Sequence, residues 1–168
     1  DPNGVTLADF YLDRRVTTGT GYSLHLRTST VSIGNVRVLR LGFGNSANHL
    51  YAVADATRLG NGIWVDGCDF GTAATLNLRI DGFLGAHVTG NEILAGSGIA
   101  LYSAGSTMLL GESEVAGNNL YGTGSNIEIS RGGTWASNHK GITVDRNKVS
   151  SGYIKLAGVN QSSANGNI

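Results

Sequence analysis

A short phrase recurs along the chain, and it constrains the fold more than any other feature. It reads Val88-Thr-Gly-Asn91-Glu-Ile93, then Val115-Ala-Gly-Asn118-Asn-Leu120, then Val144-Asp-Arg-Asn147-Lys-Val149. A fourth copy begins at Ala164 and reaches Asn167 just before the sequence stops. The steps between the four asparagines are 27, 29 and 20 residues. Repeats of roughly 20 to 50 residues are typical of solenoids, propellers and repeat arrays.

A second recurring element has the alternation of a strand. Apolar residues at every second position predict a strand with one face buried. Aligning the copies predicts two inward columns and, between them, one outward column in which Glu128 and Lys155 are neighbours about 4.8 Å apart. The four copies are Gly62-Ile-Trp-Val65, Gly98-Ile-Ala-Leu101, Asn126-Ile-Glu-Ile129 and Tyr153-Ile-Lys-Leu156. The predicted columns are Ile63, Ile99, Ile127, Ile154; Val65, Leu101, Ile129, Leu156; and Trp64, Ala100, Glu128, Lys155.

The phrase around each asparagine predicts a second strand followed by a turn. Its valines point inward, and the residue before each valine points outward, which places His87 beside Glu114. Asparagine suits the turn because it tolerates the left-handed backbone region and bonds to its own backbone. Stacked copies therefore predict a ladder of asparagine side chains.

Two strands per 20 to 30 residues, with no helical period between them, predict an all-β parallel β-helix. A leucine-rich repeat would carry a helix, and a propeller blade needs about 40 residues. We expect one continuous domain, with regular coils over residues 61–168 and irregular strand-rich coils or a cap over residues 1–60. The stretch from Ser46 to Leu59 is interpreted as an insertion, with a short helix from Tyr51 to Leu59. Because the chain stops inside a repeat, we expect truncation at its C-terminus.

Composition excludes several classes of function. Charged residues make up 14% of the 168 residues and the net charge is zero, so nothing indicates binding to nucleic acid or to an anionic membrane. No apolar run is long enough to insert in a membrane. Cys68 is the sole cysteine and is expected to be a small buried hydrophobe. The histidines lack zinc spacing, and Asp66 with Asp69 supplies too few oxygens for calcium, so neither metal nor cofactor is predicted.

Paired carboxylates on the outer face would indicate glycoside hydrolysis. The predicted columns place Tyr102 next after Asp66, and Asn119 next after Glu92, so no stacked carboxylate pair is expected. His87 and Glu114 form the one contact of an acid with a base, and they are the catalytic candidates. The alternative interpretation is a solvated cross-coil pair, which is common and contributes little.

Aromatic residues give the second set of candidates. Trp64 and Tyr102 are predicted to lie in neighbouring outward columns, with Asp66 and Glu128 close by. The rings would stack on a sugar while the acids accept hydroxyl hydrogen bonds. Exposed aromatic residues equally mark contacts between subunits, where Trp and Tyr are enriched. Trp135 has the same two interpretations.

The V-x-G-N-x-I phrase, alternating with G-I-x-V strands over residues 60–168, resembles the right-handed parallel β-helix superfamily of pectate-lyase-like proteins. Within it, low charge, abundant Gly, Ser, Thr and Asn, and the lack of a calcium-type aspartate cluster are closest in character to bacteriophage tailspike and tail-fibre proteins. The resemblance implies a right-handed single-stranded parallel β-helix. It also implies a homotrimer in the virion tail, or outside the cell, that binds cell-surface polysaccharide.

Two other functions remain open. Many proteins of this fold are polysaccharide hydrolases or lyases, so the chain is alternatively a depolymerase. The coils would also serve as the rigid rod of a bacterial surface or adhesion solenoid. The empty search for a carboxylate pair favours binding without catalysis in this chain.

Overall fold

The computed structural model describes residues 4–13, 21–27, 33–54, 60–103, 111–122, 124, 126–131, 139–160 and 163–168. Within these ranges every regular element is a strand, and each strand pairs with its neighbours in parallel. The chain coils through three long sheets, which confirms the parallel β-helix. No helix long and apolar enough to cross a membrane occurs in the described part of the chain.

Sheet A contains the strand of each asparagine phrase. Its partner residues lie 20 to 31 residues apart in the sequence, which is the length of one coil. It runs unbroken across the expected boundary near residue 60, because β4 pairs with β7. In order, sheet A contains β1 (Val5–Ala8), β4 (Ile33–Leu39), β7 (Gly60–Asp66), β9 (Phe83–Thr89), β12 (Glu114–Ala116), β16 (Thr143–Asp145) and β20 (Ser163–Asn165).

Sheets B and C share the long strand β8 (Asp69–Asp81), whose first part lies in sheet B and whose second part lies in sheet C. Sheet B is otherwise made of β2 (Tyr11–Leu12), β5 (Gly42–Phe43), β10 (Glu92–Ala95), β13 (Asn119–Leu120) and β17 (Lys148–Val149). Sheet C is otherwise made of β3 (Leu24–Arg27), β6 (Ser46–Val53), β11 (Gly98–Ser103), β14 (Asn126–Arg131) and β18 (Ile154–Ala157). A further pair joins β15 (His139–Lys140) to β19 (Val159–Asn160).

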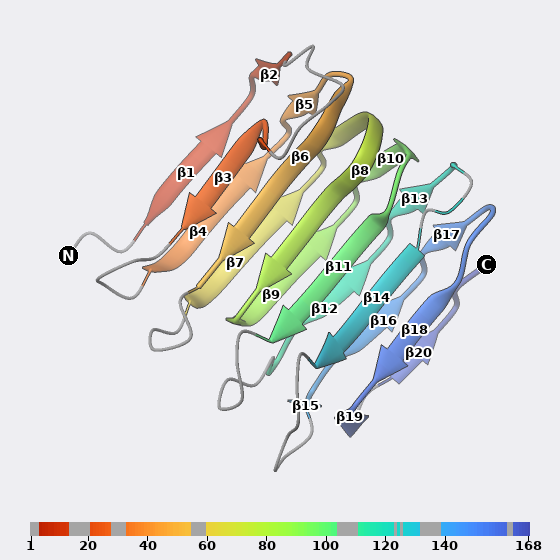
Figure 1. Ribbon diagram of the computed structural model, residues 1–168. Coiled ribbons are helices and arrows are strands. Elements are labelled where there is room, and N and C mark those ends of the chain that lie inside the picture. Colours follow the sequence, from red (N-terminus) through yellow and green to blue (C-terminus); the bar gives the residue numbers. More distant parts are fainter. Residues whose placement is uncertain are drawn as a thin grey trace.

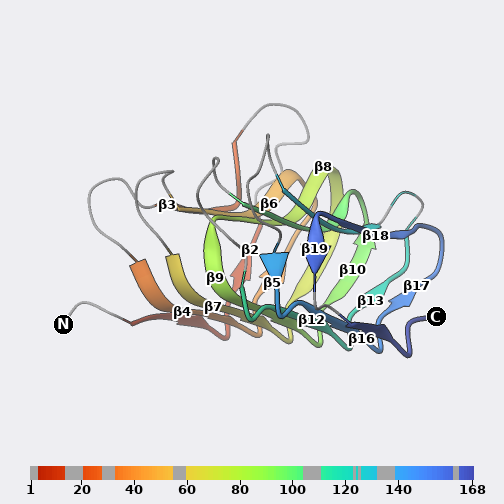
Figure 2. The same cartoon turned by 90° about the horizontal axis from the view of Figure 1, so that it is seen from below.

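The coils stack into an elongated body with its two ends far apart. Figure 1 shows sheet C in front of sheet A, with the short strands of sheet B along one long edge. Figure 2 looks at the same body from below and separates sheet A from sheet C. The core fills the space between them, and Phe43 and Phe70 stack there with ring centroids 4.7 Å apart.

The predicted columns are confirmed from Ile99 onward and are wrong for their first member, Ile63. Ile99 pairs with Ile127, and Ile127 with Ile154, as the alternation predicts. Ile63, however, lies in sheet A between Val36 and Ala86. The neighbours of Ile99 and Leu101 in the preceding coil of sheet C are Leu78 and Ile80. An alternating pattern indicates that a strand is half buried, but it does not indicate which sheet the strand joins.

The asparagine ladder is confirmed, and it lies inside the coil. Asn91, Asn118 and Asn147 are fully buried. Each Oδ1 accepts from the backbone N–H and the Nδ2 of the equivalent asparagine one coil earlier, as Asn118 does from Asn91 at 3.0 and 2.9 Å. Each Nδ2 also donates to a valine carbonyl of that earlier coil, as Asn118 does to Val88 at 2.9 Å. The ladder therefore satisfies buried backbone groups at the corner between sheets A and B.

The residue before each asparagine, and not the asparagine itself, takes the left-handed backbone. Gly90 and Gly117 have φ values of 63° and 64°, and Arg146 has a φ of 51° at the corresponding place. The expected short helix is also wrong, because Tyr51 to Val53 complete strand β6. Residues 55–59 of that expected helix lie outside the described residues.

Candidate functional site

The six site residues expected from the sequence lie on two different faces of the β-helix. Trp64, Asp66, His87 and Glu114 point outward from sheet A, whereas Tyr102 and Glu128 belong to sheet C. The expected grouping of Trp64 with Tyr102 and Glu128 is therefore wrong. The neighbour of Asp66 in the next coil is Thr89, whose hydroxyl donates to the Asp66 carboxylate.

On sheet A, four side chains from successive coils stack in one outward row. The guanidinium of Arg37 lies 5.6 Å from the centroid of the Trp64 ring, and the ring of His87 stacks on Trp64 at 5.3 Å with an interplanar angle of 5°. His87 Nδ1 lies 3.5 Å from Glu114 Oε2. Arg37 and His87 are the neighbours of Trp64 in the preceding and the following coil, so they cover its two faces. The Trp64 ring therefore has no free face on which a sugar could stack.

The expected contact between His87 and Glu114 is present, and its surroundings are those of a surface pair. Both side chains are about one-third exposed, at 32% and 40%. A pair that water reaches contributes about 0–1 kcal/mol. A shallow depression of about 360 Å³ lies beside this row, lined by Arg37, Leu39, Trp64, Asp66 and Thr89. Glu114 does not line it, so the row does not assemble an acid and a base around one cavity.

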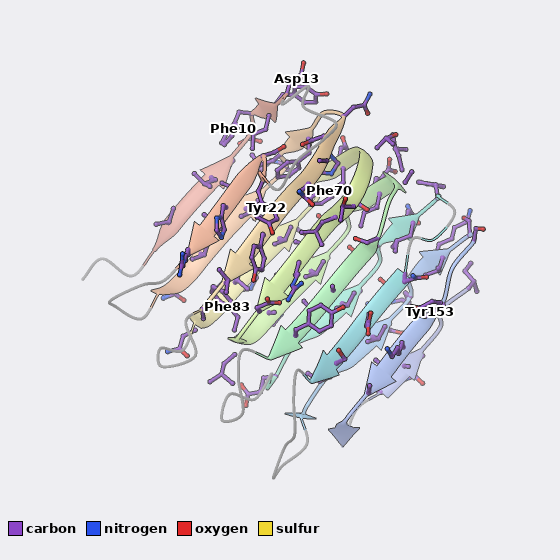
Figure 3. The ribbon with its side chains drawn as sticks, viewed as in Figure 1. Phe10, Asp13, Tyr22, Phe70, Phe83 and Tyr153 are labelled. Atoms are coloured by element: carbon purple, nitrogen blue, oxygen red, sulfur yellow. The ribbon has the colours of Figure 1, made fainter. Side chains whose placement is uncertain are left out.

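On sheet C, aromatic rings and charged side chains from four successive coils contact one another. Tyr51 stacks on His25 at 5.2 Å, and the guanidinium of Arg79 lies 5.3 Å from the Tyr51 ring and 4.8 Å from the Tyr102 ring. Asp81 is buried beside them and accepts hydrogen bonds from Arg79 Nε at 2.9 Å and from the Tyr51 hydroxyl at 2.8 Å. Figure 3 shows Tyr22 over the same part of this sheet, where its ring lies 5.0 Å from that of Tyr51.

The sheet C row continues through Tyr102 and Glu128. Glu128 accepts a hydrogen bond from the Tyr102 hydroxyl at 3.0 Å and pairs with Lys155 at 2.8 Å, as the sequence predicted for that pair. Lys155 lowers the pKa of the Glu128 carboxyl. Burial, followed by the hydrogen bond to Glu128, raises the pKa of Tyr102 to about 12. The hydroxyl therefore stays protonated as a donor, and Glu128 is bonded to both Tyr102 and Lys155.

Sheet B carries a site that sequence reasoning missed. Its outward column places Glu92 directly opposite Asp69, one coil apart. This pair corrects the expectation that no stacked carboxylates exist. A groove of about 360 Å³ runs beside the pair, lined by Tyr11, Gly42, Phe43, Asp69, Phe70, Gly71, Glu92 and Leu94. Both carboxylates are exposed.

The groove is flanked by two exposed apolar side chains over a floor of glycine. Tyr11 is 65% exposed and Leu94 is 54% exposed. A Cβ on Gly42 would lie 2.3 Å from the Tyr11 ring, so only glycine allows the ring to lie this close to the backbone of the next coil. A Cβ on Gly71 would lie 2.8 Å from the Phe43 carbonyl oxygen, so the floor is closed to side chains here too.

No positively charged side chain of the described residues pairs with Asp69 or Glu92. Among the residues that the structure describes, neither carboxylate has a hydrogen-bond or salt-bridge partner. Like charges directly opposite one another destabilise a sheet. Every other close pair of outward charges described above joins opposite signs. Nothing in the packing accounts for this arrangement, which makes it the strongest candidate for a ligand site on the described surface.

A sequence signal for this site exists one coil before Asn91. Val65-Asp-Gly-Cys68-Asp-Phe70 has the spacing of the recurring phrase, with cysteine in the place of asparagine. The structure confirms the equivalence, because the Cys68 N–H donates to Asn91 Oδ1 at 2.9 Å. Recognising Cys68 as the ladder position would have aligned Asp69 with Glu92. The thiol itself is buried, and burial raises its pKa to about 11, so it is not a nucleophile.

The described residues contain no group of three or more His, Cys, Asp or Glu side chains placed to hold a metal ion. Trp135, the remaining aromatic candidate, lies outside the described residues. The chain matches no protein-family model, and comparisons with curated proteins and with solved structures give no match either.

Proposed function

We propose that this chain is a tailspike-like segment of the pectate-lyase-like superfamily that binds cell-surface polysaccharide in the sheet B groove. The observation that carries the proposal is the combination, around one cavity, of the exposed Tyr11 ring with two carboxylates, Asp69 and Glu92, that have no partner among the described residues. An aromatic ring packs against the apolar face of a sugar, and carboxylates accept hydrogen bonds from its hydroxyls. As in the tailspikes that the repeat resembles, we expect a homotrimer in a virion tail or another extracellular setting.

The groove supports this function better than the residues expected from the sequence. Trp64 is covered on both faces, and Tyr102 and Glu128 are bonded to one another and to their neighbours. The groove, in contrast, has exposed side chains with unused acceptors, which is what a ligand requires.

The test is binding of the intact chain to a panel of capsular and lipopolysaccharide glycans. Tyr11→Ala should weaken binding of a recognised glycan about tenfold, which corresponds to about 1.4 kcal/mol of lost stacking. Tyr153→Ala is the matched control, because Tyr153 is 54% exposed but lies directly before β18 of sheet C. Equal losses in both variants, or no glycan binding by the unaltered chain, would contradict the proposal and leave the rigid-rod function.

A depolymerase is the second candidate, and the stacked carboxylates favour it. One coil step separates equivalent residues by about 4.8 Å, close to the roughly 5–5.5 Å between the carboxyls of retaining glycosidases. In that reaction one carboxylic acid protonates the leaving oxygen while the other carboxylate attacks the anomeric carbon. Water then releases the sugar, and its proton returns to the first group.

Catalysis predicts new reducing ends when the chain is incubated with a polysaccharide that it binds. Asp69→Asn and Glu92→Gln should each abolish their release, and the product should keep the anomeric configuration of the substrate. Glu114→Gln should have no effect, because Glu114 lies on sheet A, away from the groove. A bound polysaccharide that yields no reducing ends would restrict the chain to binding.

A further inference from the structure

Among the residues that the structure describes, those that line the sheet B groove carry negative charge and no positive charge. The chain as a whole has 12 basic and 12 acidic residues. Asp69 and Glu92 nevertheless lie opposite one another, and none of the residues that line the groove is basic.

The basic side chains that the structure describes near this face are engaged elsewhere or lie farther along the column. Arg40 forms a salt bridge with Asp9 at 2.6 Å. Lys148 shares the outward column of Glu92, but Asn119 stands between them in the intervening coil. Asp69 and Glu92 therefore face solvent, and the exposed ring of Tyr11 lines the same groove. Such a combination fits a ligand that itself supplies the positive charge.

We propose that the groove selects a cationic sugar, namely an amino sugar whose amine is free and protonated. This inference rests on the proposed glycan-binding function and specifies its ligand. An ammonium group has three donors, enough to bond to both Asp69 and Glu92 at once. Its charge strengthens those bonds, and a cation beside the Tyr11 ring is further attracted by the ring electrons. A neutral sugar would leave the repulsion between the two carboxylates in place.

Glucosamine oligomers and N-acetylglucosamine oligomers of equal length provide the test, because they differ by the acetyl group that removes the charge. Isothermal titration of the intact chain at low salt should give at least about tenfold tighter binding of the glucosamine oligomer, since charge-assisted hydrogen bonds exceed neutral ones by about 1.4 kcal/mol. Added salt should reduce that preference. The double variant Asp69→Asn with Glu92→Gln keeps the size of both side chains and should bind the two oligomers equally.

Asp145→Asn is the matched control, because Asp145 lies on sheet A and pairs with Arg146. This variant should keep the full preference. Equal binding of both oligomers by the unaltered chain overturns the inference while sparing the proposed function. If the double variant still prefers the glucosamine oligomer, the inference is also overturned, because residues other than Asp69 and Glu92 would then recognise the amine. Binding of Ca²⁺ alone that the double variant abolishes would assign the pair to a metal and overturn it too. Failure to bind any glycan rejects the proposed function itself.

Discussion

At the scale of single residues, Cys68 shows how closely a different side chain can reproduce the bonds of asparagine. Its Sγ accepts from the Leu41 N–H at 3.4 Å and lies 3.5 Å from the Val38 carbonyl oxygen as a donor. These are the two bonds that Asn91 makes to the coil before it, to Cys68 N–H and to Val65 O. Cys68 therefore ends the asparagine ladder while the backbone groups beyond it remain bonded.

Substitution of Cys68 should consequently depend on polarity more than on volume. Cys68→Ala leaves the Leu41 N–H without its thiol partner inside the core, and we expect a loss of about 2 kcal/mol. Cys68→Asn extends the ladder with the stronger bonds of an amide and should be neutral or stabilising. Urea denaturation of the three proteins checks this order. A Cys68→Asn protein less stable than the Cys68→Ala protein would show that space, not bonding, decides the position.

His49 is a buried histidine that has no part in the proposed site. It is fully buried close to the rings of Phe43 and Phe70, at 5.8 and 5.9 Å, and its Nε2 lies 2.8 Å from the Gly44 carbonyl oxygen. A carbonyl accepts, so we assign the proton to Nε2 of a neutral ring. Burial lowers the pKa of His49 below its usual value of 6.5.

This lowered pKa predicts that acid weakens the fold. The unfolded chain takes up the His49 proton as pH falls through about 6.5, while the folded chain resists it, so stability is complete above that pH and falls below it. The slope should reach up to about 1.4 kcal/mol per pH unit. His49→Gln should remove this part of the pH dependence in urea titrations between about pH 7.5 and 5, and His25→Gln on the outer face of sheet C should not. An unchanged slope in His49→Gln would assign the acid sensitivity to other groups.

At the scale of elements, the asparagine ladder fixes the corner between sheets A and B. Asn118 donates to Val88 O and Asn147 Oδ1 and accepts from Asn91, and all of these groups are buried. Its removal would leave several polar groups unsatisfied at once, each at about 1–3 kcal/mol. Asn167, at the last coil, is only partly buried.

We therefore expect Asn118→Ala to cost about 3 kcal/mol or more, and Asn167→Ala about 1 kcal/mol. The contrast tests the ladder itself. Both asparagines donate to a valine carbonyl of the preceding coil, but Asn118 is more deeply buried and also donates to Asn147. Chemical denaturation followed by circular dichroism measures both. Equal small losses would mean that water replaces the amide at every coil.

The same elements show what the sequence reveals and what it hides. Valines 88, 115 and 144, and isoleucines 99, 127 and 154, were predictable because the regular spacing repeats both identity and alternation. Ile63 was misplaced because Gly62-Ile-Trp-Val65 has the same alternation as the sheet C strands while lying in sheet A. That single error hid the Asp69–Glu92 pair. The approach of Tyr11 to Gly42 was equally hidden, since it joins residues that are 31 positions apart.

At the scale of the whole molecule, the β-helix has no single centre of stability. Contacts run almost entirely between neighbouring coils, so each coil depends on the one before it and the one after it. The first and last strands of sheet A have one neighbour each and are largely unburied, with exposed Val5 and Ala164 where inner strands have fully buried valines.

Hydrogen exchange should therefore be slowest in the middle and fastest at the two ends. Amides of β7, β9 and β12 should exchange at least about a hundredfold more slowly than those of β1 and β20, which corresponds to about 2.7 kcal/mol of extra opening free energy. Exchange followed by mass spectrometry of peptides resolves these strands. Uniform protection along the chain would instead indicate that all coils open together, as in a compact two-state domain.

The ladder also gives the molecule a direction. Each buried amide donates forward, from Asn91 to Asn118, from Asn118 to Asn147 and from Asn147 to Asn167, so the amide dipoles point the same way along the long axis. An extra coil that carries the V-x-G-N-x-I phrase, spliced between two existing ones, would find an acceptor ahead of it and a donor behind it. The β-helix could therefore be lengthened by inserting whole coils, and each inserted coil would have to run in the same direction as the others.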